Sequence, residues 1–474
     1  MSLKLNQSNV TPDSPVFQPM LNNLQANILK GHGRNFAHHL FIQIQPGKVA
    51  QAKQWIKTFA AQTITSAKTQ IEATDLFNAG SIPDGGTVFT LSLSAAAYDL
   101  LGITGKPASN TFRNGMAANA ALLGDDPANW DPHFKQTQHI LIIVADDHAK
   151  TAKEKAQKII KEIKTFGKLI LDQKGNVLKM SNGTGIEHFG YADGVSQPLY
   201  LKEDIDRQIS TNEWDDTTNL DRLLVRDTTT PVPDSFGSYF VFRKLEQNVK
   251  GFKTAEGDNG RAHAVCPVIN DATNTPNPDL GGAMIVGRFE SSTPVVKKSI
   301  DNISNPPVIT NDFNYADDLQ AVKCPFHAHT RLMNPRDGDT VAGDVRSHRI
   351  TRRGMPYDEA GRIPEKKITK ITDEMLDRKQ PTKDVGLLFM CYQESIENHF
   401  EILQGFWANR GQIGGHNVNG QDSIIGQGSN PPKTLPARWD HAPQTASFSM
   451  SGFVKNKGGE YFFTPSISTL KTLS

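Results

Sequence analysis

The chain has little cysteine, and none of it stands in a recognisable motif. Its three cysteines, Cys266, Cys324 and Cys391, are far apart in a sequence of 474 residues. No CxxC or CxxCH segment occurs, which disfavours a zinc knuckle and the attachment motif of c-type cytochromes. Cysteines that lie far apart in the sequence usually serve as small buried side chains in proteins of a reducing compartment. A chain of this length also needs no disulfide bond to stabilise its core.

The chain also lacks an excess of charge of either sign. It has 51 basic and 50 acidic residues, so no general field attracts nucleic acid or an anionic membrane. Its lysine-rich run at residues 148–164 has no interleaved aromatic residues and is expected to be a solvated helix face. No stretch approaches the roughly 20 apolar residues of a membrane span, and the N-terminus has no apolar leader. We therefore expect a cytoplasmic protein that binds neither nucleic acid nor membrane, and we leave a homo-oligomer open.

Apolar patterning in the first half predicts strands and helices in alternation. Ser94 is placed to cap a short helix. The segment LILDQKGNVLKM predicts a hairpin that turns at Lys174-Gly175-Asn176. Strands joined both by helices and by direct turns predict an α+β architecture with an antiparallel sheet. The predicted strands are residues 40–45, 87–93 and 138–147, and the predicted helices are residues 48–62 and 148–164.

A polar, turn-rich stretch at residues 210–234 marks a boundary, after which the pattern restarts. We predict a loose arm at residues 1–20, an N-terminal domain at residues 21–215 and a C-terminal domain at residues 216–474. In the second half, strands are predicted at residues 238–244, 281–289 and 385–393, and an amphipathic helix at residues 395–409.

The stretch CPFHAHTRLMNPR, residues 324–336, concentrates groups that bind metals. Cys324, His327 and His329 could hold zinc, and an HxH pair on a strand would place both imidazoles on one face. Against zinc, no acidic partner lies at ligand spacing. Several arginines follow, and guanidinium groups repel a dication but suit a dianionic ligand such as a haem. A pair of structural histidines stays open as the third reading.

Three further stretches contain residues that could take part in catalysis or support a metal ligand. Asp193 stands beside Gly194 in HFGYADGVSQP, where glycines let the backbone approach a ligand, although such a short motif also suits a simple turn. An arginine of RSHRITRRGMPY, residues 346–357, could stabilise negative charge that develops on a reacting oxygen. Glu394 or Glu397, where a predicted strand meets a predicted helix, could hold the second nitrogen of a ligating histidine.

Together and in this order, these stretches resemble the dye-decolourising (DyP-type) haem peroxidases. GYADGVSQP is similar to the GxxDG motif of that family, CPFHAHTRLMNPR to its CPFxAHxRxxNPR block, and RITRRGMPY to the block with its distal arginine. LQANILKGHGRNFAHHLF and GLLFMCYQESIENHFEILQGFWAN are similar to the family's opening and C-terminal segments, so the resemblance spans nearly the whole chain. It implies two ferredoxin-like α+β domains, antiparallel sheets with helices packed on them, and a non-covalent haem b bound between the domains.

The resemblance implies a role for each matching residue. His329 would be the proximal ligand of the haem iron, Asp193 the distal acid–base group and Arg352 the distal charge stabiliser and a haem contact. Glu397 is our candidate for the carboxylate behind the proximal histidine, and His327 stands where many members have a small residue. The other residues expected to bind the cofactor are Gly194, Leu387, Phe389 and Arg331.

The implied function is a haem b peroxidase that reduces hydrogen peroxide and oxidises bulky aromatic or dye-like donors in one-electron steps. Because an aspartate stays ionised at lower pH than a histidine base, activity towards dyes is expected to be best in acid. The alternatives are a non-catalytic haem carrier, a haem protein that acts on porphyrin itself, and a metal-dependent hydrolase that uses His327 and His329. A carrier would not need Asp193 and Arg352 together.

Overall fold

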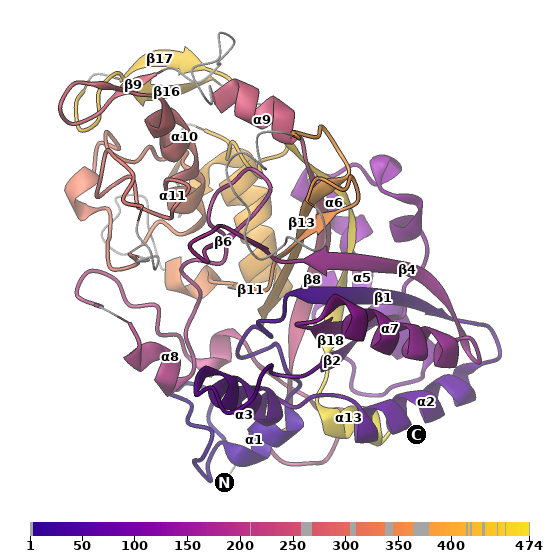
Figure 1. The fold of residues 1–474 in the computed structure, drawn as a ribbon. Coiled ribbons are helices and arrows are strands. Elements are labelled where there is room, and N and C mark those ends of the chain that lie inside the picture. The colour runs from indigo at the N-terminus through magenta and orange to yellow at the C-terminus, as the bar shows by residue number, and fades with distance from the viewer. Residues whose placement is uncertain are drawn as a thin grey trace.

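The structure of the chain is a computed structural model in which helices pack around an antiparallel sheet (Figure 1). Cys266 lies outside the residues that it describes, whereas Cys324 and Cys391 are buried free thiols. No helix among the described residues is long and apolar enough to cross a membrane. The described residues are 3–208, 210–256, 268–303, 310–336, 345–363, 379–413, 416–417, 420–428, 432–442, 444–450 and 452–473.

An antiparallel sheet of ten strands runs through both halves of the chain. Strand β18, near the C-terminus, pairs with β8 of the second half and, through Phe462 and Phe463, with β2 of the first half. The two predicted domains therefore share one sheet, and the boundary at residue 215 stays a prediction. The main path is β11 (Thr351–Arg352), β13 (Val385–Gln393), β8 (Phe236–Gln247), β18 (Val454–Thr464), β2 (Val88–Ser94), β3 (Ile140–Asp146), β1 (Phe36–Ile44) and β4 (Gly167–Asn176), with β12 (Met355–Asp358) beside β13 and β7 (Val225–Arg226) beside β8.

Helices of the first half bury apolar faces against this sheet. Helix α7 (Ala149–Ile163) buries Ala152, Ala156, Ile159 and Ile163, which recur at helical spacing and contact the β1–β3–β4 region. The predicted cap is confirmed, since the Ser94 hydroxyl accepts the amide of Ala97 at 3.2 Å at the start of α4 (Ala95–Leu100). The predicted helix at residues 48–62 is α2 (Val49–Gln62), which is followed by α3 (Ala67–Asn78).

The predicted hairpin at Lys174-Gly175-Asn176 is wrong. Strand β4 continues through these residues and pairs with β1 to the Phe36↔Asn176 position, and the chain reverses later, between β5 (Leu178–Lys179) and β6 (Gly185–Ile186). Gly175 serves close packing here, because a Cβ atom at this position would lie 2.6 Å from the sulfur of Met355.

The predicted strand at residues 281–289 is also wrong, because GGAMIV belongs to helix α10 (Pro278–Val286). Asn277 caps this helix by accepting the amide of Asp279 at 3.0 Å, and Pro278 occupies its first turn. Its residues from Leu280 to Ile285 are all buried, and a short run that is apolar on every side shows no period that distinguishes helix from strand.

The described part of the predicted loose arm, residues 3–20, is packed against later segments on both sides of the predicted domain boundary. Val10 is fully buried and forms a parallel bridge with Leu201, and the amide of Leu3 donates to Asp234 at 2.7 Å. Helix α1 (Gln18–Asn23) begins within the arm. The arm is therefore held by backbone and side-chain bonds, which a polar, Pro/Ser-bearing sequence does not reveal.

Candidate active site

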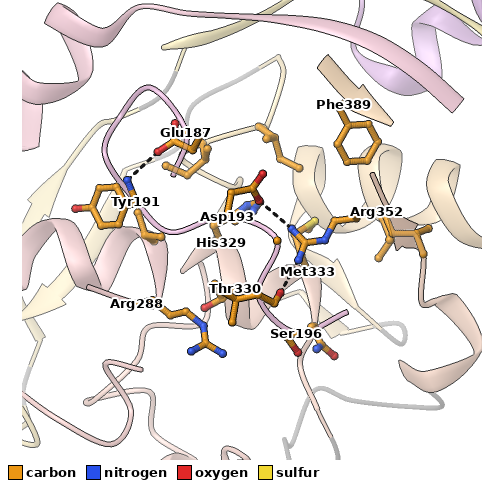
Figure 2. A pocket seen from close by; sticks show the side chains of 18 of the residues that line it. Glu187, Tyr191, Asp193, Ser196, Arg288, His329, Thr330, Met333, Arg352 and Phe389 are labelled. Atoms are coloured by element: carbon orange, nitrogen blue, oxygen red, sulfur yellow. Dashed lines mark hydrogen bonds and ion pairs between the residues drawn. The ribbon is translucent and has the colours of Figure 1, made fainter. Parts of the chain in front are cut away.

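Residues from both halves of the chain line a cavity (Figure 2). They come from the segment Glu187–Pro198, from β8 and β13, from α11 (His329–Met333) and from the π-helix η9 (Ile396–Ala408). Apolar side chains form much of the lining, among them Leu387, Phe389 and Leu403. Leu387 and Phe389, predicted to shape the pocket, both line it, as does Gly194.

His329 begins α11 and lines this cavity, with its ring fixed from behind. Its Nδ1 lies 2.7 Å from Oδ2 of Asp422, which is fully buried. The other oxygen of Asp422 accepts the amides of Ile424 and Ile425, at 2.7 and 3.0 Å. Burial opposes the charge of Asp422, but His329 and these two amides together hold the pKa of its carboxyl below the usual value. With Nδ1 bonded to Asp422, Nε2 is the nitrogen of His329 that is free to bind a metal.

The prediction that Glu397 backs the proximal histidine is wrong. Glu397 lies in the first turn of η9 and accepts the hydroxyl of Ser109 at 2.5 Å and the amide of Thr111 at 3.1 Å, so it ties η9 to the first half. Glu394, the other candidate, lies 3.3 Å from His399. Sequence reasoning missed Asp422 because it is 93 residues from His329 and no spacing rule connects the two positions.

Asp193 and Arg352 line the same cavity and form an ion pair, although 159 residues separate them. Nη1 of Arg352 lies 3.4 Å from Oδ1 of Asp193, and Nη2 donates to the carbonyl of Val195 at 2.6 Å. Gly194, at φ +79°, makes the turn that brings this carbonyl under the guanidinium group. Both side chains stay about a quarter exposed, 26% for Asp193 and 30% for Arg352, so both can reach a small molecule.

Arg353 faces away from this pair. Its guanidinium group donates to the carbonyls of Asn27 and Ile28, at 2.6 and 2.7 Å, and burial lowers its pKa to about 10. Successive residues of an extended strand point to opposite faces, so only Arg352 of the two adjacent arginines reaches the cavity.

The prediction that Arg331 binds the cofactor is wrong. Its side chain is fully buried behind the cavity wall, where it donates to Asp318 at 3.0 Å and to the carbonyl of Cys324 at 2.6 Å. The guanidinium group lies 4.4 Å from the ring centres of both Tyr315 and Phe326. Arg331 therefore stabilises the segment that precedes His329. The arginines that do line the cavity are Arg243, Arg288, Arg336, Arg349 and Arg352.

The residues present fit a haem. The cavity lining contains an imidazole with an anchored Nδ1 and an acid–arginine pair. Its apolar side chains suit a porphyrin plane. Arg288, Arg336 and Arg349 bring guanidinium groups to the same lining, the first two bonded to backbone carbonyls. Burial lowers the pKa of Arg288 to about 9, and this cost is offset where the group pairs with an anion.

The positions of His327 and His329 do not support a zinc site, the alternative considered for the HxH pair. His327 is buried outside the cavity, with Nε2 3.2 Å from the carbonyl of Thr434 and with its ring against Phe448, and burial lowers its pKa to about 4. The described part of the chain contains no group of three or more His, Cys, Asp or Glu residues that could hold a metal ion. His327 and His329 therefore do not share a hydrolytic metal site.

Comparison with known proteins gives the family. One family model, described as the DyP dimeric alpha+beta barrel domain, matches residues 23–177, and another, the C-terminal domain of Dyp-type peroxidases, matches residues 283–414. The multifunctional dye peroxidase of Amycolatopsis sp. is 36% identical over 469 residues, which cover 96% of each chain. A dye-decolorizing peroxidase of Exidia glandulosa is 30% identical over 402 residues, which cover 80% of this chain and 74% of that protein.

Solved structures agree with these sequence matches. The crystal structure of a DyP-type peroxidase from Anabaena sp. has a TM-score of 0.87 and 36% identity, and covers 100% of this chain and 98% of that chain. The likeness confirms the predicted α+β fold with two ferredoxin-like domains. The sequence motifs, the fold and the relatives thus agree, and the chain belongs to the DyP-type peroxidase family and is a haem b peroxidase.

Proposed function

We propose that His329 ligates the haem iron from one side and that Asp193 and Arg352 act on hydrogen peroxide at the other side. The observation that supports this assignment is the 3.4 Å ion pair between Asp193 and Arg352, which lies in the cavity that His329 also lines. When bound, the haem supplies the redox centre that gives up two electrons as the O–O bond of the peroxide breaks. The side chains of this protein supply proton transfer, charge stabilisation and orientation.

Asp193 moves the proton. One carboxylate oxygen would accept a proton from one oxygen of the peroxide and return it to the other, so that water leaves instead of hydroxide. General acid–base catalysis of this kind contributes about 10²–10⁴-fold to a rate. Arg352 stabilises the negative charge on the departing oxygen, and its bond to the carbonyl of Val195 holds the guanidinium group in place for this task.

Asp422 orients the proximal imidazole and raises its basicity. A carboxylate that accepts the Nδ1 proton of His329 fixes the tautomer in which Nε2 carries the lone pair. This arrangement favours electron donation from the ligand and thus higher oxidation states of the bound metal.

We further propose that hydrogen peroxide is the oxidant and that bulky aromatic or dye-like molecules are the electron donors. A relative that is 36% identical is named a multifunctional dye peroxidase, and others are named dye-decolorizing peroxidases. Donors too large to enter the cavity would be oxidised at or near the protein surface. A cytoplasmic location is part of the same proposal. A homo-oligomer is also proposed, because the matching N-terminal family is described as a dimeric domain.

The replacement Asp193→Asn tests the central assignment. It keeps the size of the side chain but removes the proton acceptor, so the second-order reaction with peroxide should slow by about 10²–10⁴-fold. The Soret band of the loaded protein should be retained, because Asp193 does not hold the haem. Asp206→Asn, at a carboxylate paired with Lys202 on α8 (Lys202–Asp206), is the matched control and should react at the normal rate. A rate in Asp193→Asn within twofold of the unaltered protein would show that Asp193 is not the acid–base group.

A further inference from the structure

Trp214 contacts three arginines beside the cavity, and it is not itself among the described residues that line the cavity. The guanidinium carbon of Arg349 lies 4.5 Å from the centre of its ring, that of Arg346 4.8 Å and that of Arg336 4.9 Å. Trp214 is only 2% exposed, and its Nε1 donates to Oδ1 of Asp216 at 2.6 Å. A buried indole therefore attracts three cations to its ring and bonds one carboxylate at its edge.

Two of these arginines and the carboxylate belong to the lining of the cavity, since Arg336, Arg349 and Asp216 all line it. The hydroxyl of Ser196, another lining residue, links two of them. It donates to Asp216 at 3.3 Å and accepts Nη2 of Arg336 at 3.2 Å. Trp214 therefore lies behind this part of the lining and contacts it at several side chains.

The backbone of this part of the lining has an unusual conformation. Ser196 has a φ of +60° and Arg336 has a φ of +57°. Residues other than glycine rarely adopt this left-handed conformation, and it persists where the surrounding contacts enforce it. Such positions are concentrated at sites that bind a ligand, so the geometry favours a binding role for these side chains over simple packing.

The bonds of the two lining arginines leave their charge available to an anion. Arg336 donates to the carbonyl of Phe313 at 2.6 Å, and Arg349 donates to the hydroxyl of Thr218 at 3.0 Å. Neutral acceptors of this kind orient a guanidinium group without cancelling its charge. A guanidinium group that is already oriented suits a carboxylate, which it can bind through two parallel hydrogen bonds.

We propose that Trp214 is a positioning residue for the recognition of the porphyrin carboxylates. Its ring holds Arg336 and Arg349 in place before the porphyrin binds, so less side-chain freedom is lost on binding and the affinity for the carboxylates rises. This inference rests on the proposed binding of the haem in the cavity that His329 lines.

Iron-free protoporphyrin IX and its dimethyl ester test the inference, because they differ only in the two carboxylates and form no bond between iron and His329. The apoprotein is titrated with each, and binding is followed by porphyrin fluorescence. The unaltered protein should bind the acid roughly 10- to 100-fold more tightly than the ester. In Trp214→Leu this ratio should fall by about tenfold, whereas Trp214→Phe keeps an aromatic face and should retain most of it.

Trp130→Leu is the matched control, because Trp130 is also a buried tryptophan, 4% exposed, but lies in the core of the first half. A loss of packing alone weakens the binding of acid and ester equally, so the ratio in Trp130→Leu should stay within about twofold of the original. If the ratio is unchanged in Trp214→Leu, or falls equally in Trp130→Leu, the inference is overturned. Trp214→Met, whose flexible apolar side chain has no aromatic face, is judged by the same criterion if Trp214→Leu does not fold.

A double-mutant cycle shows whether Trp214 acts through the arginines. Arg349→Gln should lower the ratio by itself, and Trp214→Leu should then lower it by less than it does in the unaltered protein; fully additive effects contradict the inference. His329→Ala separates this inference from the proposed function, since it should weaken the binding of hemin but leave the ratio for the iron-free ligands unchanged. If His329→Ala binds hemin normally, the proposed function fails, whereas weakened hemin binding there with an unchanged ratio in Trp214→Leu refutes the role of Trp214 alone.

Discussion

The hydrogen bond between Asp422 and His329 allows a quantitative test of the proximal side. Replacing Asp422 by Asn keeps the volume of the side chain and one oxygen for the amides of Ile424 and Ile425. The new amide nitrogen then faces Nδ1 of His329, and two N–H donors cannot bond each other. The imidazole relieves this conflict only by moving its proton to Nε2, which removes the lone pair that binds iron.

The expected size of the effect follows from the bond that is lost. A hydrogen bond to a charged group contributes about 1.5–3 kcal/mol, which corresponds to roughly a 10- to 100-fold loss of hemin affinity. A second effect is a higher reduction potential, because the neutral amide no longer increases electron donation from the imidazole. Hemin titration of the apoprotein, followed at the Soret band, and spectroelectrochemistry of the loaded protein measure the two effects.

Glu397→Gln is the control for this experiment. Glu397 is a half-buried carboxylate in the first turn of η9, a helix that lines the cavity, but it bonds Ser109 and Thr111 instead of His329. Its replacement should leave hemin affinity within about twofold of the original value, since no ligand of the cavity depends on it. If Asp422→Asn binds hemin as tightly as the unaltered protein and has the same reduction potential, the proximal assignment of Asp422 is refuted.

Two further predictions concern stability. Arg331→Met leaves Asp318 buried without its cationic partner, so the free energy of unfolding measured in urea titrations should fall by about 3–5 kcal/mol. The protein that remains folded should keep its rate of reaction with peroxide. An unchanged free energy of unfolding contradicts the stabilising role of Arg331. The pKa of Asp422 is lowered in the folded protein, so its contribution to stability is present above its unfolded pKa of about 3.8 and is lost as pH falls further. The stability difference between the unaltered apoprotein and Asp422→Asn should therefore shrink from pH 5 to pH 3, and a difference that grows in acid contradicts the ion pair.

The sequence predicted the elements whose side chains alternate or recur with a clear period. Strands β2, β3 and β13 and helix α7 lie close to their predicted bounds, because each has a bounded apolar run or an apolar face at regular spacing. Strand β1 begins at Phe36 instead of the predicted Leu40. The prediction failed at α10, where every side is buried and periodicity carries no information. It failed again at Gly175, where a glycine that reads as a turn signal serves close packing inside a strand.

The sequence predicted those residues of the site that stand in a local motif. Asp193, His329 and Arg352 each stand in a distinctive stretch, and the structure brings all three to one cavity. The residues that hold these side chains in place stand in no such motif. Asp422 lies in the segment after η9, and its contribution depends on where the chain returns after the helix, which no local pattern encodes.

This difference has a physical origin. A group that contacts the reactants must have a specific chemistry, so its residue type and its immediate neighbours are constrained and form a motif. A supporting group needs only to place one oxygen about 2.7 Å from a given nitrogen, and any segment that the fold brings there can supply it. Glu397 was a reasonable candidate by residue type, yet it lies at the end of η9 that faces Ser109. Supporting carboxylates are therefore identified from three-dimensional contacts, as Asp422 is from its bond to His329.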